Sequence, residues 1–156
     1  MTPDALTIRR ERPDEPDVMR LIAALDADMT ALYPPESNHL LDVTALMEPA
    51  VTFLVARTAG EAVACGALLD DPRGWGEVKR MYVRPDRRGR GIGRRILVEL
   101  ESIARASGRH LLRLETGIHN AEALALYRRA GFVERESFGD YKPDPLSAFM
   151  EKRIEP

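Results

Sequence analysis

Apolar residues recur every three or four positions in two long stretches of the chain. Their members are Val18, Leu21, Ile22, Leu25, Met29 and Leu32 in the first stretch, and Ile92, Ile96, Leu97, Leu100, Ile103 and Ala104 in the second. This spacing puts the apolar side chains on one face of a helix. We therefore predict two amphipathic helices, the first capped by Asp17 and the second ended by Gly108.

Short runs rich in β-branched and aromatic residues predict strands between and around these helices. The runs cover residues 7–10, 51–57, 62–69, 77–83, 111–115, 132–136 and 147–152. Shorter helices are predicted over residues 40–47 and from Asn120 to Ala130, where Gly131 follows. The result is a mixed α/β pattern with a hairpin on each side of a central strand–helix–strand unit. Because the chain has no internal repeat and no long linker, we expect residues 1–156 to form one domain.

The composition excludes several classes of protein. Of the 156 residues 44% are hydrophobic and 31% are charged, and no run approaches the roughly 18 apolar residues of a membrane helix. The polar amino terminus lacks the features of a secretory signal, so we expect a cytoplasmic protein with no membrane partner. A single cysteine, Cys65, and three scattered histidines predict neither a disulfide nor a metal site. The net charge of −2 argues against nucleic acid as a partner.

Glycine and arginine are concentrated between Arg84 and Arg95, where a predicted strand meets the second long helix. Gly89, Gly91 and Gly93 let the backbone approach a bulky anion, and the N–H groups of a helix start point toward it. Six arginines in this segment match several negative charges. The segment predicts a site for a polyvalent anion, such as the pyrophosphate of a nucleotide cofactor.

Other phosphate-binding signatures fit this segment poorly. The Gly-Lys-Ser/Thr ending of a Walker A loop is absent. The dinucleotide fingerprint begins well at Gly89 and Gly91 but has Arg94 in place of its last glycine, although Glu115 lies about 20 residues further on. An ordinary glycine-containing helix start with solvated arginines remains the alternative.

Two motifs together resemble the GNAT superfamily of N-acetyltransferases. The signature Arg/Gln-x-x-Gly-x-Gly/Ala is matched by residues 88–93, Arg-Gly-Arg-Gly-Ile-Gly, and the run from Asn120 through Tyr127 to Gly131-Phe132 is similar to the family's last helix. The chain's ending, residues 138–152, resembles a bacterial branch of these acetyltransferases. The resemblance implies a GNAT-like α/β (α+β) fold, with a mixed, mostly antiparallel sheet of about six to seven strands flanked by about four helices.

The resemblance also implies that acetyl-CoA is the cofactor. Backbone groups of Met81 and Val83 would pair with its pantetheine arm, and Tyr82 between them is also expected to bind the cofactor. The phosphates would rest on the segment from Arg88 to Arg94, with further contacts from Asn120 and Arg129. The residues implied in this segment are Arg88, Gly89, Arg90, Gly91, Ile92, Gly93 and Arg94.

Two residues are candidates for proton transfer. The resemblance puts the Tyr127 hydroxyl beside the thioester sulfur, and a phenol with a pKa near ~10 is well matched to a departing alkyl thiolate. Tyr127 also lies on the apolar stripe of its helix, so a packing role stays open. Glu77 matches a position where some family members carry a glutamate base, and strand alternation predicts that it shares a face with Lys79, Met81 and Val83. A solvated carboxylate beside Lys79 is the alternative. An oxyanion would be stabilised by a strand N–H near Met81.

The expected acceptor is the primary amine of a small molecule. The loop after the first helix would form one wall of its site and the connection before the last strand the other, and Glu36 could pair with a cationic amine. The residues expected to bind the acceptor are Tyr33, Glu36, Ser37, His39, Arg80 and Tyr141.

Other functions remain open at this point. The chain could be a non-catalytic CoA-binding or regulatory module, or an N-acetyltransferase acting on proteins or peptides, and the arginine cluster could serve nucleic acid. The resemblance also allows a homodimer.

Overall fold

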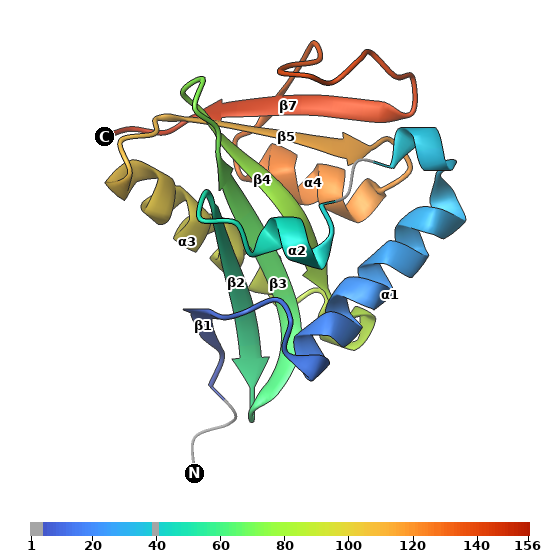
Figure 1. The fold of residues 1–156 in the computed structure, drawn as a ribbon, viewed down its shortest axis with the longest axis vertical. Coiled ribbons are helices and arrows are strands. Elements are labelled where there is room, and N and C mark those ends of the chain that lie inside the picture. Colours follow the sequence, from blue (N-terminus) through green and yellow to red (C-terminus); the bar gives the residue numbers. More distant parts are fainter. Residues whose placement is uncertain (1–4, 39–40) are drawn as a thin grey trace.

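The predicted strands join one mixed sheet of seven strands in the order β1-β2-β3-β4-β5-β7-β6. Figure 1 shows the last strand, β7, lying beside β5. The computed structural model describes residues 5–38 and 41–156. The strands are β1 Thr7–Arg10, β2 Val51–Thr58, β3 Glu61–Asp70, β4 Gly76–Val83, β5 Leu111–Gly117, β6 Val133–Arg135 and β7 Ser147–Arg153. All neighbouring strands pair antiparallel except β4 and β5, which pair parallel.

Helices cover both faces of the sheet. They are α1 Pro16–Leu32, α2 Val43–Leu46, α3 Ile92–Ala106 and α4 Ala121–Arg129, with short 3-10 turns at η1 Pro35–Ser37 and η2 Pro85–Arg87. The apolar stripes of α3 and α4 pack on one face, and those of α1 and α2 pack on the other. Within the described residues, this arrangement of seven strands and four α-helices confirms the predicted fold class.

Some local predictions differ from the structure. The N-cap of α1 is Glu15, and Asp17 lies in the first helical turn, where it binds Arg57. The predicted second helix begins at residue 40, which lies outside the described residues. Of its described part, residues 41–47, Val43–Leu46 are helical, and Asp42 caps them by accepting a hydrogen bond from the Ala45 N–H. The last strand, β7, lies between β5 and β6, so β6 pairs at the edge of the sheet. None of the helices within the described ranges is long and apolar enough to cross a membrane.

A β-bulge interrupts β4 at Arg80. Lys79 faces Ala67 and Tyr82 faces Cys65, so Arg80 and Met81 together oppose a single β3 residue. Arg80 takes a left-handed conformation with φ of 57°, which is costly for a residue with a side chain. Bulges re-aim side chains, and this one reverses the alternation of the strand.

The bulge corrects one expectation from the sequence. Met81 and Val83 pack against the core under α3, whereas Glu77 hydrogen-bonds to Tyr141 on the other side of the strand. The prediction that Glu77 shares a face with Met81 and Val83 was therefore wrong. Simple alternation fails here because one residue of the strand is added at the bulge.

Beyond the bulge, β4 and β5 separate. Their pairing runs from Gly76 with Leu112 to Val78 with Leu114, and no pairing follows in the described remainder of either strand. The backbone edges of β4 and β5 past these residues are therefore open toward each other. A gap thus opens between these two parallel strands.

Candidate functional site

The start of α3 leaves a row of backbone N–H groups without intrahelical partners. Gly91 is the N-cap in the left-handed region with φ of 76°, and it provides no side-chain cap. Gly89 has a similar φ of 79°, and a Cβ added at either position would meet nothing within 4 Å. These two glycines form an open turn in front of free amides, which suits an anion.

Gly93 serves a different purpose from that expected. A Cβ at Gly93 would lie 3.1 Å from the Leu126 side chain of α4. Its lack of a side chain therefore allows α3 and α4 to pack closely. Ile92, the neighbouring residue, is buried in the same core.

Several arginines near this turn already have protein partners. Arg84 and Arg87 pair with Asp86 and Glu61. Arg88 donates to the Val83 carbonyl at 2.9 Å. Arg94 donates to the Arg129 carbonyl at 3.4 Å. The side chains of Arg90, Arg94 and Arg95 at the start of α3, and of Arg129 at the end of α4, are all exposed.

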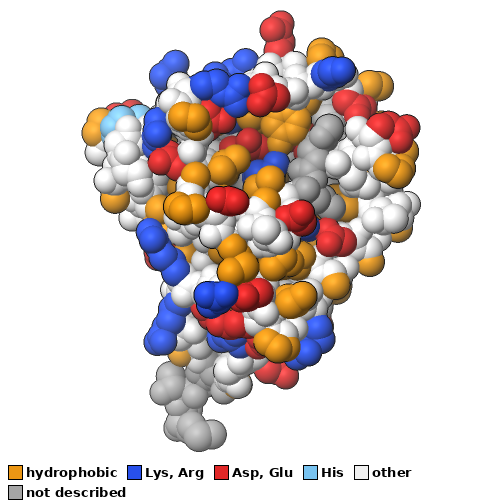
Figure 2. Space-filling view, viewed as in Figure 1, with side chains coloured by type: hydrophobic (Ala, Val, Ile, Leu, Met, Phe, Trp, Pro, Cys, Tyr) orange, Lys and Arg blue, Asp and Glu red, His pale blue; other side chains and the backbone are white. Residues whose placement is uncertain are grey.

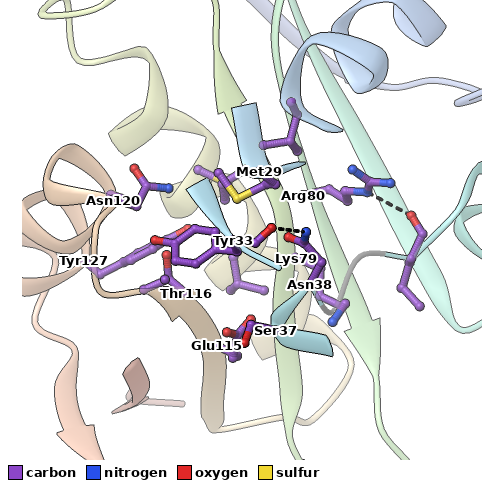
Figure 3. Close-up of a pocket in the computed structure, with 16 residues that line it drawn as sticks. Met29, Tyr33, Ser37, Asn38, Lys79, Arg80, Glu115, Thr116, Asn120 and Tyr127 are labelled. Carbon is purple, nitrogen blue, oxygen red and sulfur yellow. Dashed lines mark hydrogen bonds between the residues drawn. The ribbon is translucent and has the colours of Figure 1, made fainter. Parts of the chain in front are cut away.

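A pocket occupies the gap between β4 and β5 (Figure 3). Figure 3 shows the labelled side chains gathered around one space although they come from α1, the loop after it, β4, β5 and α4. The lining residues are Leu25, Met29, Tyr33, Ser37, Asn38, Leu41, Val78, Lys79, Arg80, Met81, Glu115, Thr116, Gly117, Asn120, Ala123 and Tyr127. We call this the catalytic pocket, after the role that we propose for it below.

Tyr127 lines the catalytic pocket from α4. Its ring packs edge-on against Phe132 with centroids 5.7 Å apart, so its position is fixed by the core. Its hydroxyl has no hydrogen-bond partner among the residues that the structure describes. Burial raises the pKa of Tyr127, and the charge of Glu115 raises it further, so the phenol is protonated at neutral pH.

Glu115 is the acidic side chain that lines the catalytic pocket. It lies on β5 just past the last pairing with β4, and Ser147 donates a hydrogen bond to its Oε2 at 2.7 Å. Sequence reasoning did not select Glu115 for this role. The alternation of β5 could have indicated its position. It buries Leu112, Leu114 and Thr116 on one side of the strand, so Glu115 lies on the other side.

Glu77 lies outside the lining of the catalytic pocket and has partners of its own. Its Oε2 accepts from the Tyr141 hydroxyl at 2.5 Å and from Lys79 Nζ at 3.2 Å. Lys79 also donates to the Tyr141 hydroxyl at 2.6 Å. These contacts join the three groups into one cluster, which holds the Lys79 ammonium at the border of the catalytic pocket.

The residues expected to bind the acceptor divide between two places. Tyr33, Ser37 and Arg80 line the catalytic pocket, whereas Glu36 and Tyr141 line a second pocket beside it. Arg80 is engaged by Asp26 at 2.5 Å and by the Leu41 carbonyl at 2.8 Å. His39 lies outside the described residues.

Hydrogen bonds connect the segment that follows α1 to residues on the other side of the catalytic pocket. The Tyr33 hydroxyl accepts from the His119 N–H at 3.0 Å, and a side chain at Gly117 would overlap the Tyr33 ring. Ser37 donates to Asp144 at 2.7 Å in the last loop. These contacts narrow the opening on this side of the pocket.

The expected cofactor residues surround the same gap. Met81 and Asn120 line the catalytic pocket, and Asn120 is the N-cap of α4 without making a side-chain capping bond. Val83 ends β4 beside Gly93. The Tyr82 side chain instead packs on the α1 face, so its expected contact would have to use the backbone.

Cys65 lies in the core beneath α1, outside the lining of the catalytic pocket. Burial raises the pKa of the Cys65 thiol to about 12, so it is not a thiolate nucleophile. No group of side chains that could hold a metal ion occurs in the part of the chain that the structure describes.

Comparison with known proteins assigns this arrangement to a family. The family model "Acetyltransferase (GNAT) family" matches residues 18–132, which include β4, the α3 turn and α4. The chain belongs to the GNAT acetyltransferase family. It is therefore an acetyltransferase, as the glycine-arginine segment and the Tyr127 motif predicted.

Relatives along the whole length agree with this assignment. The acetyltransferase is 53% identical over 150 residues to the IAA acetyltransferase of Azospirillum brasilense, covering 96% of this chain and 98% of that protein. A crystal structure from Klebsiella pneumoniae, described as an acyl-CoA N-acyltransferase, has a TM-score of 0.82 and 42% identity, covering 96% and 98% of the two chains.

A more distant structure shares the fold. The PaiA N-acetyltransferase of Thermoplasma acidophilum, crystallised in complex with coenzyme A, has a TM-score of 0.74 at 17% identity, covering 96% of this chain and 99% of that one. At this identity the likeness bears on the fold alone.

Proposed function

We propose that this acetyltransferase transfers the acetyl group of acetyl-CoA to the primary amine of a small molecule by direct attack in a ternary complex. Acetyl-CoA supplies an activated acetyl thioester when bound. The described residues fit it in two respects. The open turn at Gly89 and Gly91 offers free amides to a pyrophosphate, and the unpaired edge of β4 offers backbone groups to an extended amide chain.

Tyr127 is proposed as the proton donor. Burial keeps its phenol protonated, so its hydroxyl holds a proton that it can give to a departing thiolate. The raised pKa makes this phenol a weaker acid than one with the ordinary pKa of ~10. A free hydroxyl in a pocket is available for this step, whereas the Tyr141 hydroxyl is already bonded to Glu77 and Lys79.

Glu115 is proposed to bind the acceptor amine and to accept its proton. An amine with a pKa near ~10 enters as an ammonium ion, which a carboxylate in the pocket attracts and can deprotonate. Glu77, the base suggested by the sequence, is the second candidate. The contacts of Glu77 with Tyr141 and Lys79 instead support a structural role, in which Glu77 holds the Lys79 side chain in position.

The enclosure of the catalytic pocket supports a small acceptor. Tyr33 and Ser37 connect the loop after α1 to the β5–α4 turn and to the last loop. An extended peptide would have to break these two hydrogen bonds to enter the pocket, whereas a small amine can bind with both of them intact.

The observation that carries the proposal is the meeting of three features at one gap: the unpaired edge of β4, Tyr127 on α4 and Glu115 on β5. The test uses purified protein freed of bound nucleotide. We expect CoA and acetyl-CoA to raise the melting temperature in a concentration-dependent way. We also expect thiol release that requires an added amine, from a panel of aliphatic, aromatic, polyamine, amino-acid and peptide acceptors. No thermal shift with acetyl-CoA, or acetylation of peptides alone, would overturn it.

A further inference from the structure

We propose that the second pocket binds the apolar body of the acceptor, so that the acceptor is a primary amine carrying an aromatic or similarly large apolar group. This inference rests on the proposed function, because it assumes that the amine itself reaches Glu115 in the catalytic pocket. It names the class of acceptor that the site selects.

The second pocket adjoins the catalytic pocket. Leu41 and Lys79 line both, so one molecule can reach from one to the other past these two side chains. Figure 2 shows this face of the molecule hollowed between α2 and the loop before β7, with hydrophobic side chains in the hollow and charged ones at its rim. The lining residues are Glu36, Leu41, Leu69, Asp71, Arg73, Trp75, Glu77, Lys79, Phe138, Gly139, Asp140, Tyr141, Lys142, Pro143 and Asp144.

Aromatic rings form one wall of the second pocket. Trp75 meets Phe138 edge-on with centroids 6.0 Å apart, and Phe138 meets Tyr141 edge-on at 5.1 Å. The guanidinium groups of Arg73 and Arg113 lie 4.7 and 4.5 Å from the Trp75 ring. The wall is therefore held in place before any ligand binds, which favours flat apolar groups.

The acidic groups of this lining are largely satisfied by the protein. Asp71 pairs with Arg73 at 2.9 Å, and Glu77 is held by Tyr141 and Lys79. Asp144 accepts from Ser37 at 2.7 Å. A polycationic acceptor would have to break these bonds in order to pair with the carboxylates. An apolar group can instead contact the apolar part of the pocket lining without disturbing them.

Fluorescence tests binding in the second pocket without activity. Trp75 is the only tryptophan of the chain, so the tryptophan emission comes from a side chain that lines this pocket. With CoA present, we expect 2-phenylethylamine to change the Trp75 emission in a saturable way. Ethylamine, which has the same amine and no aromatic body, and spermidine should cause no saturable change.

A substitution in the wall tests which acceptors depend on it. Leu69 lines the second pocket from β3 and is partly buried, and Leu69→Lys would place an ammonium ion in the lining of this pocket. We expect KM for 2-phenylethylamine to rise about tenfold or more, with the turnover of ethylamine and the affinity for CoA unchanged. Val98→Lys, on the exposed face of α3, is the matched control and should leave both acceptors unaffected.

A second variant covers the case in which Leu69→Lys folds poorly. Leu69→Ala removes apolar surface without adding charge, and we expect it to raise KM for 2-phenylethylamine several-fold while ethylamine is unaffected. The inference is overturned if ethylamine or spermidine is acetylated as efficiently as 2-phenylethylamine, or if both Leu69 variants lower activity equally for all acceptors. Those results would leave the proposed function intact, whereas absence of any acetyl transfer would overturn that function itself.

Discussion

At the scale of single residues, contacts decide which of several similar side chains can do chemistry. Burial raises the pKa of both Tyr127 and Tyr141, and in Tyr141 the charge of Glu77 adds to this effect. The Tyr141 hydroxyl is committed to Glu77 and Lys79, however, while that of Tyr127 has no partner among the described residues. The sequence singled out Tyr127 by its place in a motif, and the structure adds the free hydroxyl in a pocket.

Tyr127→Phe tests the proton donor. We expect kcat to fall about 100-fold or more, because the departing thiolate loses its positioned acid, while the affinity for acetyl-CoA stays nearly constant. The measurement is steady-state kinetics together with a thermal-shift titration. Tyr82→Phe, which removes a hydroxyl on the α1 face, is the matched control and should keep its turnover. Normal turnover in Tyr127→Phe would refute the assignment.

Glu115→Gln and Glu77→Gln distinguish the two candidate bases. If Glu115 accepts the amine proton, its variant should lose activity near neutral pH and recover part of it at alkaline pH, where the acceptor is already a free amine. Glu77→Gln should keep the shape of the pH–rate profile, because its carboxylate holds Lys79 rather than the acceptor. The opposite pattern in the two profiles would return the role of base to Glu77.

At the scale of elements, the junctions between strands and helices create the site. The bulge at Arg80 and the end of pairing after Val78 open β4 toward β5, and the turn at Gly89 and Gly91 opens toward the start of α3. The sequence predicted the glycine turn well, since glycine spacing is a local signal. It did not predict the bulge, because Arg80 takes its left-handed conformation through contacts with Asp26 and the Leu41 carbonyl.

Gly91→Ala tests the turn. A Cβ at a φ of 76° is unfavourable by roughly 1–2 kcal/mol, so the turn should move away from the conformation that presents its amides. We expect the Kd for CoA to rise about tenfold, measured by calorimetric titration. Gly60→Ala provides the control, because Gly60 has a φ of 80° and equally open surroundings in the β2–β3 turn. It should lower stability similarly and leave CoA binding unchanged; equal Kd values in the two variants would contradict the prediction.

At the scale of the whole molecule, buried or partly buried ion pairs connect distant segments. Arg57 on β2 binds Glu11, Glu15 and Asp17, which precede or begin α1. Arg135 on β6 binds Glu151 on β7, and within the β3–β4 turn Arg73 binds Asp71. Hydrogen bonds from these arginines lower the pKa of four carboxyl groups, those of Glu11, Asp17, Asp71 and Glu151.

These shifts predict sensitivity to acid. A carboxyl group whose pKa is lower in the folded state contributes stability above its unfolded pKa and loses it as the pH falls through the folded value. The melting temperature should therefore drop as the pH falls below about 4. The pKa of Glu15 is raised by its hydrogen bond with Glu11 and acts in the opposite direction, so it offsets part of the effect.

Arg57→Gln provides the corresponding variant for calorimetry between pH 7 and pH 3. It should melt several degrees lower at pH 7, with a shallower dependence on pH, because the pKa values of Glu11 and Asp17 return toward normal. Arg12→Gln is the control, since Arg12 binds only the exposed Asp14 in the described structure and should change little. An unchanged pH dependence in Arg57→Gln would exclude this ion-pair cluster as the source of acid sensitivity.

The sequence by itself determined the elements, the class of fold and the family. These properties depend on local signals, namely the apolar periodicity, the helix-ending glycines and the glycine-arginine turn. Each signal involves only a few neighbouring residues, so it can be recognised in the sequence. Only the tertiary structure decided which carboxylate enters the catalytic pocket, how the bulge reverses β4, and that Gly93 serves packing with Leu126. Those features depend on contacts between segments distant in the sequence, such as Glu115 with Ser147 and Glu77 with Tyr141. Pairing of that kind is set by the packing of the whole sheet.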